Sequence, residues 1–222
     1  MTDAVVFDLD GVLVDTEQLW DEVREQLVAD IGGRWHPGAQ VEMMGMSSIE
    51  WSRYMRDELG VPLPPEEISD EVVRRLVERL DGGVPRLPGA ERVVADLAAR
   101  WPLGLASSAN RPVIDVVLER TGLRRYFAAT VSSEEVPRGK PAPDVYLEAV
   151  RRLDARPEHC VAVEDSTNGI ASAHAAGLRV VAVPNPHYPP AADVLARADR
   201  VLDALADLDA ALVAGLAPAD PW

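Results

Sequence analysis

VVFDLDG, residues 5–11, contains the strongest structural signal in the chain. Its first three residues are β-branched or aromatic, which predicts a short strand buried on both faces of a sheet. Asp8 and Asp10 follow at the end of this strand, and their spacing of two directs both side chains to the same face. Gly11 allows a sharp turn directly afterwards. Because a buried carboxylate is costly unless it is paired or bound to a metal, this strand end predicts a functional site.

The sequence after this stretch divides into two patterns. Residues 16–82 carry three amphipathic helical stripes and no strand between them, which predicts a helical insert. From residue 83 onwards, short apolar strands alternate with helices, a pattern typical of a parallel sheet covered on both faces. We therefore predict an α/β fold with two parts. A Rossmann-like, three-layer core with a mostly parallel sheet is formed by residues 1–15 and 83–222, and a small all-helical domain, residues 16–82, is inserted after the first strand.

Composition narrows the range of partners. The 222 residues carry a net charge of −15, which disfavours nucleic acid and anionic membranes because the long-range field repels them. No apolar run is long enough to cross a membrane, and no hydrophobic leader precedes the first strand. Cys160 is the only cysteine, so no disulfide forms within the chain. We therefore expect a cytoplasmic protein, and a monomer is compatible with the sequence.

Polar residues gather where the predicted parallel strands end, which is the edge at which such sheets bind ligands. The candidates are Asp8 and Asp10 after the first strand, Ser107 and Ser108 after the second, Lys140 between the third and fourth, and Glu164 and Asp165 after the fourth. Crowded carboxylates repel one another, and a divalent cation relieves the repulsion. Ligands that are all oxygen favour Mg²⁺ over zinc, and a lysine at the same edge suits a phosphate group. The residues therefore predict phosphoryl chemistry with Mg²⁺ as the cofactor.

This combination of motifs resembles the haloacid dehalogenase (HAD) superfamily of phosphohydrolases. The matching segments, in chain order, are Asp8-Leu9-Asp10-Gly11-Val12, Ala106-Ser107-Ser108, Gly139-Lys140-Pro141-Ala142-Pro143-Asp144, and Val163-Glu164-Asp165-Ser166 with Gly169. The resemblance covers essentially the whole chain and is close to the β-phosphoglucomutase/phosphatase subgroup. It implies that the helical insert, residues 16–82, is a C1-type cap domain on a HAD-like core.

The resemblance implies roles for the four carboxylates. Asp8 would be the nucleophile that takes the phosphoryl group as an aspartyl-phosphate, and it would also be a ligand of Mg²⁺. Asp10 would protonate the leaving oxygen and then activate water, while its backbone carbonyl faces the metal. Asp165 would bind Mg²⁺ directly, and Glu164 would bind it directly or through water.

The same resemblance implies how the phosphoryl group is held. Ser107 would donate a hydrogen bond to it, and Lys140 would offset its charge and that of Asp8. Ser108 and Asn110 are further candidates for contact with phosphate or substrate.

The implied activity is hydrolysis of a small phosphorylated metabolite, a phosphate monoester such as a sugar phosphate. A β-phosphoglucomutase-type mutase is the alternative. Such mutases hold a second phosphate with a lysine and an arginine of the cap, where this chain has Met44 and Ser48, and their cap histidine corresponds to Trp20. Arg53 or Arg56 could replace the missing cations, but the apolar segment favours a phosphatase. A non-catalytic phospho-ligand binding protein would be expected to lack a motif residue, and none is lacking.

Three tryptophans of the insert have two interpretations. Trp20, Trp35 and Trp51 can form the core of the cap or line a substrate pocket. We interpret them as core residues, which is the commoner role of such side chains.

Overall fold

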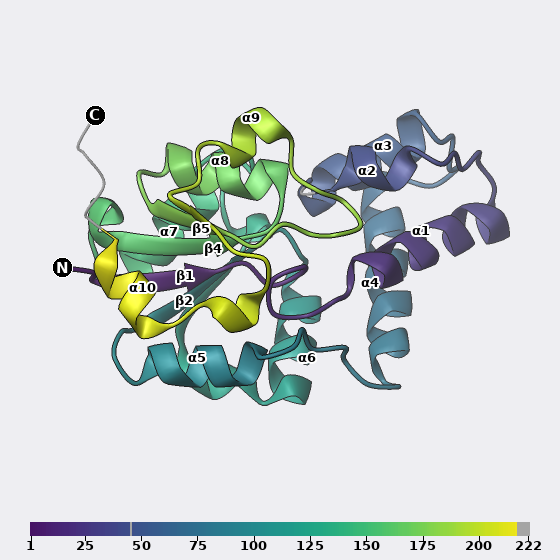
Figure 1. Ribbon diagram of the computed structural model, residues 1–222. Helices are drawn as coiled ribbons and strands as arrows, with labels where there is room; N and C mark the ends of the chain where they lie inside the picture. The colour runs from purple at the N-terminus through teal and green to yellow at the C-terminus, as the bar shows by residue number, and fades with distance from the viewer. Residues whose placement is uncertain (45, 217–222) are drawn as a thin grey trace.

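The computed structural model describes residues 1–44 and 46–216 (Figure 1). Six strands form one sheet in the order β3-β2-β1-β4-β5-β6, and every pairing between neighbours is parallel. The strands are β1 (Ala4–Phe7), β2 (Leu103–Ser107), β3 (Phe127–Ser132), β4 (Cys160–Glu164), β5 (Arg179–Ala182) and β6 (Arg200–Val201). The prediction of an α/β fold with a mostly parallel sheet is therefore confirmed.

Helices cover both faces of the sheet, because alternate residues of each buried strand point to opposite sides. Val5 and Phe7 of β1 belong to one apolar cluster, whereas Ala4 and Val6 belong to another. The first cluster contains side chains of α5 (Ala90–Ala98), α6 (Arg111–Thr121) and α10 (Ala210–Gly215). The second contains side chains of α7 (Asp144–Arg152), α8 (Thr167–Ala175) and α9 (Ala192–Leu195). Figure 1 shows α5 and α6 on one side of the sheet and α7 and α8 on the other.

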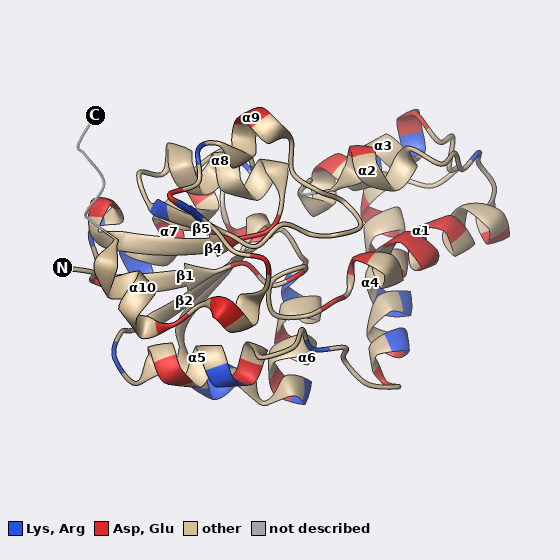
Figure 2. Ribbon diagram, in the orientation of Figure 1, with Lys and Arg blue, Asp and Glu red and all other residues tan. Residues whose placement is uncertain are grey.

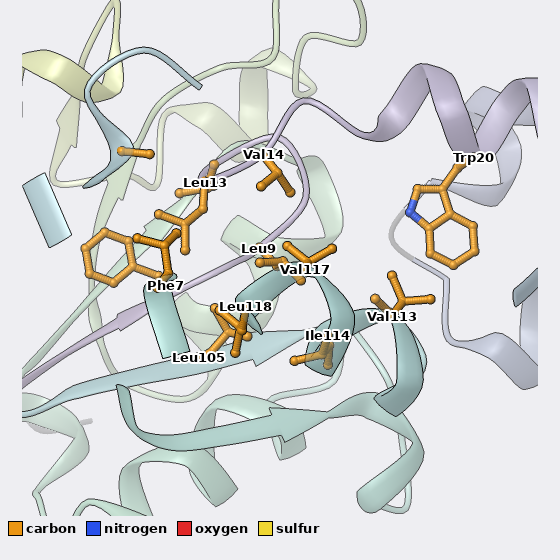
Figure 3. Close-up of a cluster of buried hydrophobic side chains, with 14 of the residues drawn as sticks. Phe7, Leu9, Leu13, Val14, Trp20, Leu105, Val113, Ile114, Val117 and Leu118 are labelled. Atoms are coloured by element: carbon orange, nitrogen blue, oxygen red, sulfur yellow. The ribbon is translucent and has the colours of Figure 1, made fainter. Parts of the chain in front are cut away.

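The first apolar cluster reaches from the sheet toward the helical insert. Figure 3 shows Phe7 and Leu105 beside residues of α6, among them Leu118 and Ile114. Trp20 of the insert belongs to the same cluster. Burial of this continuous surface holds the two parts of the chain together at their junction.

The segment between β1 and α5 is helical throughout its regular structure. It contains α1 (Glu17–Ile31), α2 (Ala39–Met43), α3 (Ser48–Asp57) and α4 (Pro65–Leu80), which stand beside the sheet in Figure 1. A capping box begins α3, since both the N–H and the hydroxyl of Ser47 donate to Glu50 Oε2, at 2.8 and 2.7 Å. The sequence pattern predicts three of these helices. Helix α2 has only five residues, too few for a periodic stripe.

The part of the chain that the structure describes also contains four short 3₁₀ helices: η1 (Leu123–Tyr126), η2 (Ser133–Glu135), η3 (Pro157–His159) and η4 (Leu205–Asp207). Among the described residues, no helix combines the length and the apolar character that crossing a membrane would require.

The strand order sets the location of the site. The chain builds the sheet outward from β1 through β2 to β3, and then crosses to the other side of β1 to add β4, β5 and β6. Such a reversal leaves a crevice at the carboxyl ends of the strands on either side of it. Asp8 directly follows the central strand β1, and Asp165 directly follows β4.

Candidate active site

Three carboxylates meet at the carboxyl ends of β1 and β4, where Figure 2 shows acidic residues in red. Phe7 is paired with Val163 in the parallel register, and the Asp8 N–H donates to the Val163 carbonyl at 3.0 Å. This register brings Asp8 beside Glu164 and Asp165, and one oxygen from each of the three lies within 4.8 Å of the others. Asp8 is 8% exposed, and the other two are essentially buried.

Lys140 neutralises part of this negative charge. Its ammonium group donates to Asp8 Oδ1 at 2.8 Å and to Glu164 Oε1 at 2.6 Å, and the side chain is buried. The Tyr146 hydroxyl donates to the same oxygen of Glu164 at 2.8 Å, and its ring lies under the ammonium group. Lys140 is the only lysine in the sequence, so every other basic side chain apart from histidine is an arginine. A compact ammonium group can approach two carboxylates and a ring where a planar guanidinium would need more space.

Two glycines make room for the carboxylates. A Cβ atom on Gly11, whose φ is +77°, would lie 1.9 Å from Asp165 Oδ2. A Cβ atom on Gly169 would lie 1.9 Å from the Glu164 carboxyl group. Glu164 Oε2 also accepts from the N–H of Asp165 at 3.0 Å, so its carboxylate is held by the start of the following loop. These glycines are therefore required by the close packing of the acidic groups.

Asp10 has its own set of partners. Its Oδ1 accepts a short hydrogen bond from the Thr16 hydroxyl and another from Trp20 Nε1 at 3.2 Å. Thr16 directly precedes α1 and Trp20 lies in its first turn, and Asp10 is nearly buried. The contacts fix the carboxyl group of Asp10 in one orientation beside Asp8.

Burial dominates the electrostatics of the cluster. It raises the pKa of Asp8 to about 7, against the opposing effect of the nearby Lys140 charge. Burial and the negative charges of Glu164 and Asp8 raise the pKa of Asp165 well above its usual value. Burial also raises the pKa of Asp10. Burial alone would lower the pKa of Lys140, but the carboxylates of Asp8 and Glu164 outweigh it and raise the pKa. Buried, crowded oxygen ligands of this kind fit a hard divalent cation such as Mg²⁺.

A pocket opens between the strand ends and the helical insert. Its core wall consists of Asp8, Asp10, Ser108, Ala109, Lys140, Asp165 and Ser166, and its insert wall consists of Glu17, Trp20, Arg24, Met43, Met44, Met46 and Trp51. The interpretation of Trp20 and Trp51 as core residues alone is therefore incomplete, because both are buried and also line the pocket.

The serines and the asparagine after β2 lie in different surroundings. Ser108 lines the pocket. Ser107 is fully buried at the strand end, and its hydroxyl accepts a hydrogen bond from the Ala109 N–H at 3.0 Å. Asn110 is not among the pocket residues; its amide donates to Glu134 Oε1 at 2.8 Å and to Ser69 Oγ of α4 at 3.2 Å. The structure thus places Asn110 in a link between the core and the insert.

Sequence reasoning missed three partners of the site residues. Thr16 and Trp20 bind Asp10, and Tyr146 binds Glu164. Thr16 follows the first motif closely enough to have been a candidate. Trp20 and Tyr146 give no local signal, because their roles depend on how helices pack against the strand ends.

The comparisons with known proteins agree with this geometry. The family model of the haloacid dehalogenase-like hydrolases matches residues 2–177. The bifunctional riboflavin kinase/FMN phosphatase of Arabidopsis thaliana is 30% identical over 210 residues, which cover 94% of this chain and 55% of that protein. The chain thus spans about half the length of this relative. Hexitol phosphatase B of Escherichia coli K12 is 33% identical over 187 residues, covering 82% of this chain and 84% of its own.

Among solved structures, CbbY from Rhodobacter sphaeroides in complex with xylulose-(1,5)bisphosphate superposes with a TM-score of 0.82. It is 29% identical in sequence, and the match covers 94% of this chain and 96% of that one. The family match over most of the chain, together with the sheet order and the acidic cluster at the ends of β1 and β4, confirms the resemblance recognised in the motifs. The chain is an enzyme of the haloacid dehalogenase-like hydrolase family.

Proposed function

We propose that the protein is a Mg²⁺-dependent phosphatase that hydrolyses a phosphate monoester of a small metabolite through an aspartyl-phosphate on Asp8. The observation that carries the proposal is the position of Asp8 between the ammonium group of Lys140 and the carboxylates of Glu164 and Asp165. Phosphatase names among the relatives support the reaction class.

Asp8 is the proposed nucleophile. Lys140 binds its Oδ1, which leaves Oδ2 as the oxygen that attacks phosphorus. An ionised carboxylate needs no base to activate it, and the positive charge of Lys140 favours the ionised form. Asp8, Glu164, Asp165 and the main-chain carbonyl of Asp10 would hold Mg²⁺, which supplies positive charge to the phosphoryl oxygens.

Asp10 is the proposed acid and base. Burial raises its pKa, which favours the protonated form that can donate to the leaving oxygen. The Thr16 hydroxyl and Trp20 Nε1 hold its Oδ1, which keeps the group aligned for proton transfer. Once deprotonated, Asp10 would take a proton from the water that attacks the phosphorylated Asp8.

We also propose that residues 16–82 act as a cap domain. The pocket has one wall from this segment and one from the core, which is the arrangement that excludes water from a bound ester. A few polar contacts bridge the two parts at the rim, including Ser48 Oγ to Glu134 Oε1 at 3.1 Å and Asn168 Nδ2 to the Met44 carbonyl at 2.9 Å. Breaking them would let the cap open for substrate entry and product release.

The test is inorganic phosphate release from a panel of phosphorylated metabolites, with Mg²⁺ and with EDTA, for wild type and Asp8→Asn. We expect Mg²⁺-dependent turnover of at least one small monoester by the wild type, and a loss of about 10³-fold or more in Asp8→Asn, because the amide is not a nucleophile. A variant that releases phosphate as fast as the wild type would disprove the proposal. Isomerisation of β-glucose 1-phosphate in the presence of the bisphosphate, without hydrolysis, would identify the mutase instead.

A further inference from the structure

Arg24 is a buried cation in the insert wall of the pocket. It lies on α1 one turn after Trp20, is 5% exposed, and lines the same pocket as Asp8 and Lys140. Lys140 and Arg24 are the two cations among the residues that line this pocket, and they come from its opposite walls, the core and the insert. The proposed reaction gives a role to Lys140, beside Asp8, but none to Arg24.

The guanidinium group of Arg24 has few partners. A guanidinium offers five N–H donors. Within residues 1–44 and 46–216, the hydrogen bond of Arg24 is the one from Nη1 to Gln40 Oε1, at 3.0 Å, and no carboxylate forms an ion pair with it. Its Nε is buried and has no acceptor. Buried charges in proteins are normally paired directly, whereas the acids near Arg24, which are Glu17, Asp21 and Asp10, favour its charged form without forming an ion pair with it.

The surroundings of Arg24 hold the group in place without satisfying its donors. The guanidinium carbon lies 4.8 Å from the centroid of the Trp20 ring and 4.7 Å from that of Trp51. Aromatic faces stabilise a cation, but they leave the N–H bonds in the guanidinium plane without acceptors. Burial lowers the pKa of Arg24 only to about 10, against the opposing charges of Glu17, Asp21 and Asp10, so the side chain is charged at neutral pH.

We infer that Arg24 binds a second acidic group of the substrate, a carboxylate or a phosphate, at the end of the molecule remote from the ester that Asp8 attacks. The inference rests on the proposed phosphatase function. An ester phosphate at the strand ends would place the rest of the substrate between the two walls, and an acidic group there would supply the missing acceptor. Gln40 would position Arg24, since its Nε2 also contacts Glu17 Oε2 at 3.2 Å and so fixes the amide.

The experiment compares substrates that differ only in the second acidic group. The probes are 3-phosphoglycerate against glycerol 3-phosphate, and fructose 1,6-bisphosphate against fructose 1-phosphate. For wild type with Mg²⁺, we expect kcat/KM to favour the acidic member of at least one pair by about 10- to 100-fold, the size of a charge-assisted hydrogen bond. Preference in the first pair identifies a carboxylate, and preference in the second identifies a phosphate.

The variant Arg24→Met keeps the length of the side chain and removes its charge. The acidic-to-neutral ratio of kcat/KM should fall to about 1, chiefly through a higher KM for the acidic member, and Arg24→Lys should restore part of it. Arg34→Met is the matched control, because Arg34 is an exposed arginine of the same insert and does not line the pocket. It should leave the ratio unchanged.

Equal kcat/KM values for both members of both pairs in the wild type would overturn the inference. So would an Arg24→Met variant that loses activity on the acidic and neutral members by the same factor, which would assign Arg24 to cap stability. If no phosphate release by the wild type depends on Asp8, the proposed function itself fails. If the neutral esters are hydrolysed as well as the acidic ones, only the inference about Arg24 fails.

Discussion

Replacing Lys140 with methionine perturbs the candidate site most sharply. The variant has a side chain of similar length that leaves Asp8, Glu164 and Asp165 buried without their counter-charge. Removing one member of a buried ion pair typically costs about 3–5 kcal/mol, because the remaining charge is desolvated and unpaired. For a chain of this size we expect the melting temperature to fall by about 10 °C.

The cost of Lys140→Met should depend on pH. The wild-type pKa of Asp8 is about 7, and Lys140 holds it down, so in the variant this pKa lies higher. When an acid has a higher pKa in the folded protein than in the unfolded chain, its contribution to stability is complete at a pH below the unfolded pKa. That contribution is lost as the pH rises through the pKa of the folded protein. In the wild type, the contribution of Asp8 to stability is lost by about pH 7. In the variant, the unfolding free energy continues to fall above this pH, by up to about 1.4 kcal/mol per pH unit. The difference in unfolding free energy should therefore be larger above pH 8 than near pH 5.

Urea unfolding in EDTA, at one pH below 6 and one above 8, measures this difference. Arg138→Met is the matched control: Arg138 lies two residues away and pairs with Asp144 at 2.9 Å on the surface, where such a pair contributes at most about 1 kcal/mol. Lys140→Arg should recover some stability but not phosphatase activity. A cost for Lys140→Met no larger than that of the control, or one independent of pH, would refute the reasoning.

Three further predictions follow from the same contacts. Gly169→Ala should weaken Mg²⁺ binding by about 10-fold or more, because the new Cβ atom would collide with Glu164. Calorimetry measures this affinity, and Gly215→Ala, at a position with open space around it, should leave it unchanged. Trp20→Phe removes the donor to Asp10 and should lower kcat for phosphate release by about 5- to 10-fold with little change in KM; an unchanged kcat would remove Trp20 from the positioning of Asp10. Mg²⁺ should raise the melting temperature more at pH 8 than at pH 5.5. Without metal, Asp8 and Asp165 have raised pKa values, so at the lower pH Mg²⁺ must displace protons from them. A larger rise at pH 5.5 would contradict this prediction.

The parallel sheet and the meeting of its polar strand ends were accessible from the sequence. Apolar runs in the sequence end in or are directly followed by Asp8, Glu164 and Asp165. The carboxyl ends of parallel strands lie at one edge of the sheet, whatever the details of helix packing. Lys140 follows the same logic less directly, since it lies in a connection and not at a strand end. Its position between the third and fourth strands predicts its placement at this edge, and the resemblance to the family adds its role beside Asp8.

The contacts between the core and the helical insert were not accessible in this way. Periodicity tells which face of a helix is buried, but not what that face meets. The position of Asn110 after the second motif predicts a phosphate or substrate contact, and nothing in the sequence indicates that its amide donates to Ser69 of the insert and to Glu134. Arg24 lies one turn after Trp20 on the same face of α1, and a charged residue on a buried stripe could have been singled out.

Mass spectrometry of the phosphorylated enzyme tests the central claim most directly. Wild type is quenched in acid during turnover of a substrate from the panel, and Asp10→Asn is quenched after mixing with the same substrate; both are then digested. We predict that the wild-type peptide containing Asp8 gains the mass of one phosphoryl group, and that Asp10→Asn slows both formation and hydrolysis of this group, because Asn can neither protonate the leaving oxygen nor activate water. Phosphate release without a phosphorylated Asp8 peptide in either protein, or phosphorylation of a different residue, would contradict the account.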